Sequence, residues 1–434
     1  MSTLQNQFET GVEAPVYISA QVPGIGGALK ARPEDFFVEE IPLYDPCGEG
    51  EHIYLMVERH GLSTIQMRDA LARHFRVRPH AIGHAGLKDK HALTRQVFSV
   101  HTPGKKPEDF PSFEHTNARI LWVDLHTNKL KRGHLSGNRF SLRVRNVDPT
   151  HVIHAHRAMQ ILASNGVPNR FGSQRFGYLQ NNHLVGRALI LGDAKGALDL
   201  LLSPHAGSPK GQIESRTAYS EGRLDEASAK MHKVFKVEYR ALKLLAQGAS
   251  PEQAIRAIDQ TAAGFYISSF QSAIFNSVLN ERVRAGTSGQ LLPGDLAFVL
   301  KSRKCFGVTD TELMDPELRD RLSRFEIAPS GPMWGTTMPR ASGEIGNRED
   351  AALAQAGVTT KDMESCEARD GFAMIGGDRR PMCIPVIDPM VDAGSDEHGP
   401  YIRCAFDLPR GSFATTVMDE VMKVSGIEEH ADGA

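Results

Sequence analysis

GNRFSLRVR, residues 137 to 145, alternates apolar and polar side chains along its length. The apolar face carries Phe140, Leu142 and Val144, and the residues between them are polar or cationic. Because successive side chains of a strand point to opposite sides of a sheet, this spacing predicts a half-buried strand with a cationic outer face.

Outward from this strand, the preceding sequence is also rich in expected strands. Three segments are expected to be strands from their β-branched and aromatic content: DFFVEEIPLY (35–44), HIYLMVER (52–59) and RQVFSV (95–100). STIQMRDALARHF (63–75) lies between the last two and opens with a capping box from Ser63 to Gln66. Met67, Leu71 and Phe75 then recur at helical spacing, which predicts a helix.

The sequence after residue 145 changes character. Asp148 and Pro149 predict the start of a helix that ends near Gly166, and mostly helical segments follow. Strand-like sequence resumes at RRPMCIPVID, from residue 379. This order predicts an α+β protein in which residues 1–165 and 379–434 build one discontinuous domain and residues 166–378 form an insertion.

Length and composition set wide limits. A chain of 434 residues suggests two to three domains, and 41% hydrophobic with 24% charged residues is ordinary for a globular protein. No apolar run approaches the roughly 18 residues of a membrane span. The five cysteines lie far apart, which argues against a disulfide framework and fits a reducing cytoplasm. With a net charge of −2, any nucleic-acid surface must be local.

One local basic surface is evident in KLKRGHLSGNRFSLRVR, residues 129–145, which contains no acidic residue. Its cations are Lys129, Lys131, Arg132, Arg139, Arg143 and Arg145. Such a run is usually a solvated face, but in a chain of net negative charge it also suggests contacts with RNA phosphates.

AGLKDKHALTRQ, residues 85–96, places one carboxylate, Asp89, between Lys88 and Lys90. The segment reads as a loop that leads into the strand at 95–100. One interpretation is a surface loop with incidental ion pairs. The other is a catalytic carboxylate that nearby cations keep ionised at neutral pH. The segment alone does not decide between them.

Several other motifs are interpreted first as structural. NRFGSQRFG (169–177) reads as a crossover loop whose phenylalanines fill a core, and SGPMWG (330–335) reads as a turn. His151 and His154 share a helix face, but no Cys or carboxylate completes a metal set nearby. No metal site is expected.

Taken in order, these pieces resemble one family, the TruD family of tRNA pseudouridine synthases. AGLKDKHALTRQ is similar to the family signature that carries the catalytic Asp, LKARPEDFFVEE to its N-terminal motif and GNRFSLRVR to its Asn-x-Phe motif. The resemblance runs from about Lys30 to about Val417. It leaves the segments 301–329 and 340–378 and the acidic tail without an assigned role.

The resemblance implies a catalytic role for Asp89. It implies that active-site support and substrate contacts come from Lys30, Phe36, Glu40, Asn138 and Phe140. We expect Lys30 to be the cation that keeps Asp89 ionised, because burial alone would raise the pKa of Asp89. Phe140 is a candidate to stack on a flipped uracil, with a plain core residue as the alternative.

The resemblance also implies a fold: a mixed, largely antiparallel sheet with a central cleft and an inserted, mainly helical domain. The implied reaction is isomerisation of uridine to pseudouridine in tRNA, with position 13 as the expected site, by a cytoplasmic monomer without a cofactor or metal. Two alternatives stay open, a synthase acting on another RNA and a non-catalytic RNA-binding protein. The sequence does not tell which tRNAs are modified, or whether Asp89 acts as nucleophile or base.

Overall fold

The structure is a computed structural model that describes residues 13–370 and 375–424. The chain folds into two compact units. Within the described residues, the sheet unit comprises residues 18–167 and 384–424, and the helical unit comprises residues 13–17 and 168–383. The chain leaves the sheet unit after Val167 and returns to it at Ile384, whereas the sequence suggested crossings at 165/166 and 378/379.

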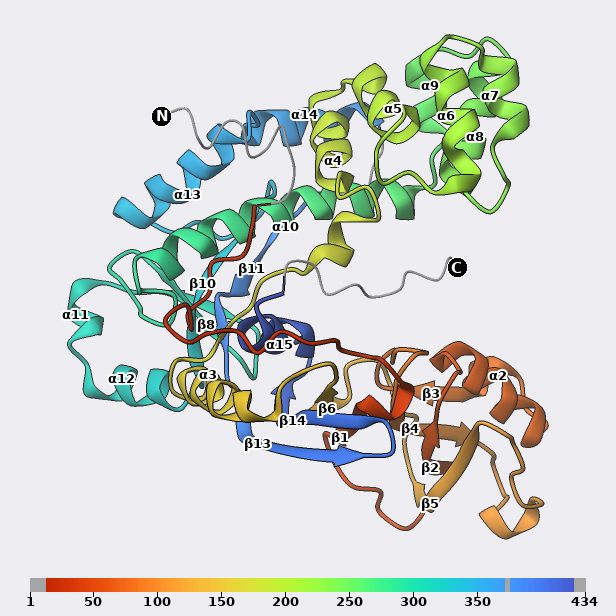
Figure 1. Ribbon diagram of the computed structural model, residues 1–434, viewed down its shortest axis with the longest axis vertical. Coiled ribbons are helices and arrows are strands. Elements are labelled where there is room, and N and C mark those ends of the chain that lie inside the picture. Colours follow the sequence, from red (N-terminus) through yellow and green to blue (C-terminus); the bar gives the residue numbers. More distant parts are fainter. Residues whose placement is uncertain (1–12, 371–374, 425–434) are drawn as a thin grey trace. The chain divides into compact units, whose positions relative to one another are not determined.

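An eight-stranded sheet forms the core of the sheet unit, in the order β13-β14-β6-β1-β4-β2-β5, with β3 paired to β4 (Figure 1). The strands before the crossing are β1 (Phe36–Pro42), β2 (His52–Arg59), β3 (Ile82–His84), β4 (Leu93–His101), β5 (Ala118–His126) and β6 (Leu135–Val144). The strands after it are β13 (Ile387–Asp396) and β14 (Gly399–Pro409). β1 runs parallel to β4 but antiparallel to β6, so the sheet is mixed. The protein is therefore α+β.

β6 joins the two halves of this sheet. It pairs antiparallel with β1 on one side and with β14 on the other. The expected alternation is present: Phe140, Leu142 and Val144 are buried, while Ser141 and Arg143 are partly exposed. β14 is far away along the chain, yet it covers the edge that β6 would otherwise expose.

Three helices complete the sheet unit: α2 (Thr64–His74), α3 (Val152–Asn165) and α15 (Ala414–Met422). The predicted capping box is present at α2, where Ser63 accepts from the backbone of Gln66 and the Gln66 side chain accepts from the backbone of Ser63. Met67 and Leu71 of α2 pack with Ile53 and Phe98 in one apolar cluster.

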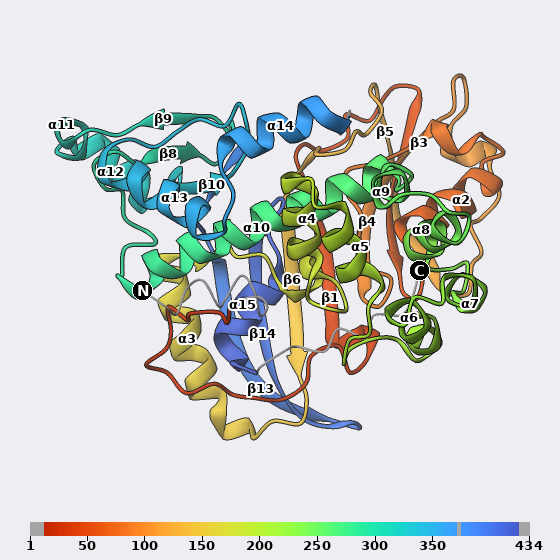
Figure 2. The same cartoon turned by 90° about the horizontal axis from the view of Figure 1, so that it is seen from above.

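The helical unit is organised around one long helix, α10 (Gln260–Arg284), which contacts α4, α13 and β10 (Figure 2). Its other helices are α4 (Asn182–Leu191), α5 (Ala194–Leu202), α6 (Ile213–Ser220), α7 (Leu224–Lys230), α8 (Lys236–Ala246), α9 (Pro251–Arg256), α11 (Asp310–Leu313), α12 (Pro316–Ser323), α13 (Gly343–Gln355) and α14 (Thr360–Asp370). A four-stranded sheet, β11-β10-β8-β9, comprises β8 (Leu296–Val299), β9 (Cys305–Gly307), β10 (Ile327–Met333) and β11 (Asp378–Pro381).

Two sequence interpretations differ from the structure in this unit. SGPMWG was expected to be a turn, but its first four residues lie in β10, which is paired with β8 and β11 and buried. Burial between two neighbouring strands outweighs the turn preference of glycine and proline there. Most of residues 340–370 forms α13 and α14. The acidic tail falls largely outside the described residues, and no described helix is long and apolar enough to cross a membrane.

Candidate active site

Asp89 lies in the loop between β3 and β4 of the sheet unit, and its side chain is 36% exposed. The Lys30 ammonium group donates to Oδ2 of Asp89 at 2.7 Å. The backbone N–H of His91 donates to the other carboxylate oxygen, Oδ1, at 3.0 Å. The sequence placed Lys30 beside Asp89, and the structure brings the two together although they are separated by 59 positions.

Two features position Lys30: an unusual backbone conformation and a contact with the ring of Phe36. Its φ angle is 59°, in the left-handed region that residues with a side chain seldom adopt. Two residues earlier, Ala28 forms an isolated β-bridge with Arg145. The ammonium group lies 4.7 Å from the centre of the Phe36 ring, a cation–π contact with the first residue of β1. Backbone strain of this kind is frequent at functional sites.

The pKa of Asp89 lies below its usual value. Burial raises it, but the hydrogen bond from Lys30, the hydrogen bond from the His91 backbone and the charge of Lys30 together outweigh that effect. The carboxylate is therefore ionised near neutral pH while it stays open to solvent. An ionised, accessible carboxylate can attack an electrophilic carbon or accept a proton.

Behind Asp89 a second ion pair is buried. The Lys88 ammonium group lies 3.1 Å from Oε2 of Glu40, and the two side chains are 6% and 1% exposed. Lys88 also donates to Oδ1 of Asn138 on β6. Burial raises the pKa of Glu40 and lowers the pKa of Lys88, in each case against the attraction of the other. Glu40 and Asn138 thus contact the residue next to Asp89 rather than Asp89 itself.

A buried arginine supports the same loop. Arg59, at the end of β2, donates to the side-chain oxygens of Thr64 at 2.9 Å and of Gln96 at 3.0 Å. Thr64 in turn accepts from the backbone N–H of Lys88 at 2.9 Å, and Gln96 donates to the carbonyl of Gly86 at 2.8 Å. Burial lowers the pKa of Arg59 to about 10. These contacts fix the backbone that presents Asp89.

Sequence reasoning assigned no role to Lys88 or Arg59. Lys88 stands beside Asp89 in AGLKDKHALTRQ, so its position was a usable signal. Nothing in the stretch HIYLMVER marks its final arginine as buried, because arginine is mostly an exposed residue. Its burial depends on β4 and α2 arriving on either side.

The aromatic candidates are more enclosed than Asp89. Phe140 is 6% exposed, and its ring centre lies 5.6 Å from that of Phe406, its cross-strand neighbour on β14. Phe36 is also 6% exposed. For Phe140 the core interpretation accounts for this packing, and a stacking role requires the ring to become accessible when a base enters.

The expected RNA-binding residues separate into two groups. Lys131 and Arg132 are exposed in the turn before β6, and the described residues offer neither side chain an ion pair. Lys129 is partly exposed and donates to the carbonyl of His80. These three cations keep their charge without a carboxylate partner among the described residues and remain candidates for phosphate contacts.

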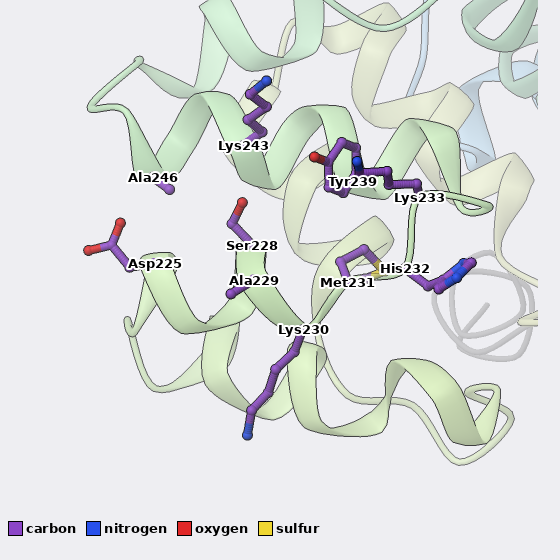
Figure 3. A pocket seen from close by; sticks show the side chains of 10 residues that line it. All are labelled: Asp225, Ser228, Ala229, Lys230, Met231, His232, Lys233, Tyr239, Lys243 and Ala246. Carbon is purple, nitrogen blue, oxygen red and sulfur yellow. The ribbon is translucent and has the colours of Figure 1, made fainter.

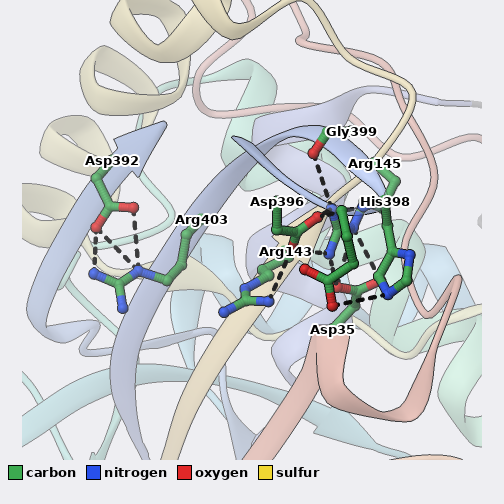
Figure 4. A network of polar contacts seen from close by, with 9 residues as sticks. Asp35, Arg143, Arg145, Asp392, Asp396, His398, Gly399 and Arg403 are labelled. Atoms are coloured by element: carbon green, nitrogen blue, oxygen red, sulfur yellow. Dashed lines mark hydrogen bonds and ion pairs between the residues drawn. The ribbon is translucent and has the colours of Figure 1, made fainter. Parts of the chain in front are cut away.

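Arg145 belongs to the other group (Figure 4). Its guanidinium is 6% exposed and pairs with Asp35 at 2.7 Å and with Asp396 at 2.6 Å. Arg143 pairs with Asp396 at 3.2 Å and lies over the ring of Tyr401. The expectation that Arg145 contacts RNA does not fit this geometry, because its charge is already neutralised. The network instead ties the β13–β14 hairpin to β6.

Comparison with known proteins covers most of the chain. The family model described as tRNA pseudouridine synthase D (TruD) matches residues 12–421. The chain belongs to the TruD family. Curated TruD relatives include tRNA pseudouridine synthase D of Syntrophotalea carbinolica, 38% identical over 94% of this chain and 98% of the relative. That of Geobacter metallireducens is 39% identical over 94% of this chain and 97% of the relative.

A solved TruD structure shows the same architecture. The crystal structure of a TruD protein from Methanosarcina mazei aligns with a TM-score of 0.83 and 26% identity, over 97% of this chain and 98% of the other. The TruD match therefore includes both units, and the segments 301–329 and 340–378 that resembled the family poorly lie inside it. The match leaves the roles of individual site residues to be tested.

Proposed function

We propose that this protein is a tRNA pseudouridine synthase that isomerises uridine to pseudouridine, with the sheet unit as its catalytic domain. Membership of the TruD family and the activity named for its curated relatives support this proposal. The main structural support for this proposal is the Lys30–Asp89 ion pair, in which Lys30 keeps the accessible carboxylate of Asp89 ionised.

The reaction breaks the bond between N1 of uracil and C1′ of ribose and forms a bond between C5 and C1′. The uridine must leave its stack for the enzyme to reach these atoms. If Asp89 attacks C1′, the N1–C1′ bond breaks as an ester to C1′ forms, and this ester breaks when C5 of the turned uracil attacks C1′. If Asp89 instead removes a ribose proton, elimination breaks the N1–C1′ bond, and the proton returns to the ribose when C5 adds to C1′. In both cases C5 loses its proton and N1 ends protonated. Lys30 stabilises the charged carboxylate, while Lys88, Glu40 and Asn138 hold its loop. Atoms and electrons balance without an added reactant, so no redox partner is needed.

Replacing Asp89 with Asn is the decisive test. Asn keeps the shape of the side chain but cannot ionise, so we expect Asp89→Asn to lose pseudouridine formation and to retain tRNA binding. Pseudouridine is measured by chemical mapping on an unmodified tRNA, and binding is measured by filter retention. Asp45→Asn, on the same unit and outside the site, is the matched control. Isomerisation by purified Asp89→Asn would refute the catalytic assignment.

The RNA target is proposed at a finer level as uridine 13 of tRNA. Mapping pseudouridine in cellular RNA with and without the gene tests this position and detects a different RNA target. Wild-type protein that binds tRNA without forming pseudouridine would favour the non-catalytic alternative. We also propose that the protein acts as a monomer in the cytoplasm, where its tRNA substrate is found. Sedimentation and fractionation test these two points.

A further inference from the structure

A second cationic site lies in the helical unit, among residues with no part in the site around Asp89. It is a pocket of about 380 Å³ lined by Phe171, Arg303 and Arg380, with Ser268 and Gln271 of α10 along one wall. Phe171 comes from the segment NRFGSQRFG, which the proposed catalytic chemistry does not use. Arg175 of the same segment donates to Ser268 at 2.7 Å, which places it beside this wall.

Aromatic rings and neutral groups, not carboxylates, hold these three arginines. Arg380 lies 4.1 Å from the centre of the Phe171 ring and donates to Asn169. Arg175 lies over the ring of Phe265 and donates to two serines of α10. Arg303 is exposed and lies over the ring of Phe298. Within the described part of the chain, no ion pair with a carboxylate involves any of the three.

Two other arginines of the same unit are held by carboxylates instead, and one of them, Arg379, also lines the pocket. Buried Arg282 pairs with Asp295 at 3.1 Å, and buried Arg379 pairs with Glu349 at 2.7 Å. Asp378 also lines the pocket, but its Oδ1 accepts from the backbone N–H of Arg379. Among the described residues, Asp378 is the one carboxylate in the pocket lining, and it forms no ion pair with Arg175, Arg303 or Arg380.

The three positive charges affect one another. Burial lowers the pKa of Arg380 to about 10, and the charges of Arg303 and Arg175 contribute to this shift in the same direction. Like charges held close together raise the energy of the folded protein. An anion bound among them would lower that cost, and the planar guanidinium group of arginine can donate two parallel hydrogen bonds to two oxygens of a phosphate.

A larger cavity in the same unit does not share this property (Figure 3). It measures about 680 Å³ and lies between α7 and α8, with Lys230, Lys233 and Lys243 among its lining residues. Lys230 is already paired with Glu214 and Glu226. The ends of Lys230 and Lys243 point away from each other in Figure 3, so they do not converge on one anion. Size alone therefore does not identify the binding site.

We propose that the pocket lined by Arg303, Arg380 and Phe171, with Arg175 beside its α10 wall, binds a backbone phosphate of the RNA substrate. The proposal rests on the proposed function only for the identity of the RNA. A free nucleotide or pyrophosphate offers the same chemistry and is the alternative source of the phosphate. The helical unit would then contribute affinity independently of the chemistry at Asp89.

Arg303→Gln tests the proposal because it removes one charge from an exposed side chain and breaks no described ion pair. We expect the slope of log affinity against log salt, measured with an unmodified tRNA transcript, to decrease by about one unit. Lys301→Gln is the matched control: it removes one exposed charge two positions away, outside the pocket lining. Its slope is expected to change less. Equal slopes in wild type and Arg303→Gln would overturn the proposal, as would equal decreases in both variants.

Two further measurements distinguish failure of the RNA assignment of the pocket from failure of the proposed catalytic function. Pyrophosphate binding to wild type and Arg303→Gln is measured by calorimetry. Pyrophosphate binding that depends on Arg303, combined with an unchanged tRNA slope, would assign the pocket to a free phosphate compound and overturn the RNA assignment. Pseudouridine formation by wild type is measured separately. Its absence would refute the proposed function and leave the comparison of salt slopes intact.

Discussion

At the scale of single residues, Lys30 can be used to test what keeps Asp89 ionised. The wild-type pKa of Asp89 is lowered, so activity should be lost only as the pH falls through a value below the usual range. In Lys30→Met, burial acts without the cation and the pKa of Asp89 rises. We therefore expect lower activity and an acid limb of the kcat/KM profile that moves to higher pH.

The control for this prediction is Lys90→Met, the same substitution one residue beyond Asp89. Lys90 is exposed and makes no described ion pair with Asp89. Its acid limb should stay close to that of the wild type. An acid limb that moves equally in both variants would mean that the general positive charge of the loop matters, and not the contact from Lys30.

A second residue-scale prediction concerns the Lys88–Glu40 pair. Lys88→Met leaves the Glu40 carboxylate buried without its cation, which typically costs about 3–5 kcal/mol of stability. Adding Glu40→Gln removes the unpaired charge and should recover part of that loss. Urea unfolding of the single and double variants measures both steps. A double variant less stable than Lys88→Met would show that the pair is not the main cause.

These residues show where sequence reasoning succeeds and where it stops. The resemblance placed Lys30, Glu40, Asn138 and Asp89 in one site. In the structure Lys30 pairs with Asp89, while Glu40 and Asn138 contact Lys88, the residue before Asp89. The resemblance did not reveal that Glu40 and Asn138 bond to Lys88, because partner choice among nearby polar groups depends on backbone positions. Arg145 was misjudged for the same reason: an alternating strand pattern does not show which cations meet a carboxylate.

At the scale of elements, the turn that leads into β6 carries the accessible positive charge. The double variant Lys131→Gln/Arg132→Gln should weaken tRNA binding and reduce the salt slope by about one unit for each cation that contacts a phosphate. Arg145→Met, which removes a paired cation in the same segment, should instead lower stability and leave the slope unchanged. Binding titrations at several salt concentrations, with urea unfolding, measure both effects. If the single variant Arg145→Met reduced the salt slope of tRNA binding, Arg145 would contact RNA as the sequence predicted.

Elements were predictable where one local rule dominates. The alternation of GNRFSLRVR and the capping box at Ser63 are local features, and both are present in the structure. SGPMWG was misread because its proline and glycine favour a turn when neighbours are ignored. In the protein its first residues belong to β10, which lies between β8 and β11, and both neighbours come from distant parts of the chain. Pairing at such distance is not visible in the local sequence.

At the scale of the whole molecule, the chain order and the spatial units do not coincide. The sheet of the sheet unit needs β13 and β14, which are made after the entire helical unit. Most of the helical unit, in contrast, is one continuous segment, residues 168–383, whose ends meet: the backbone N–H of Asn169 donates to the carbonyl of Met382 at 2.8 Å. An inserted unit with adjacent ends has the continuity that independent folding requires.

We therefore expect two fragments to behave differently. Residues 168–383 should unfold in one cooperative urea transition, because the fragment contains α10 and the strands that pack on it. Residues 1–165 should not, since β6 loses its partner β14 and Phe140 loses its contact with Phe406. Joining 18–167 to 384–424 through a short Gly-Ser linker restores that edge and should recover a cooperative transition. A cooperative transition for 1–165 alone would show that the sheet does not depend on the returning strands, and the discontinuous domain would then be wrong.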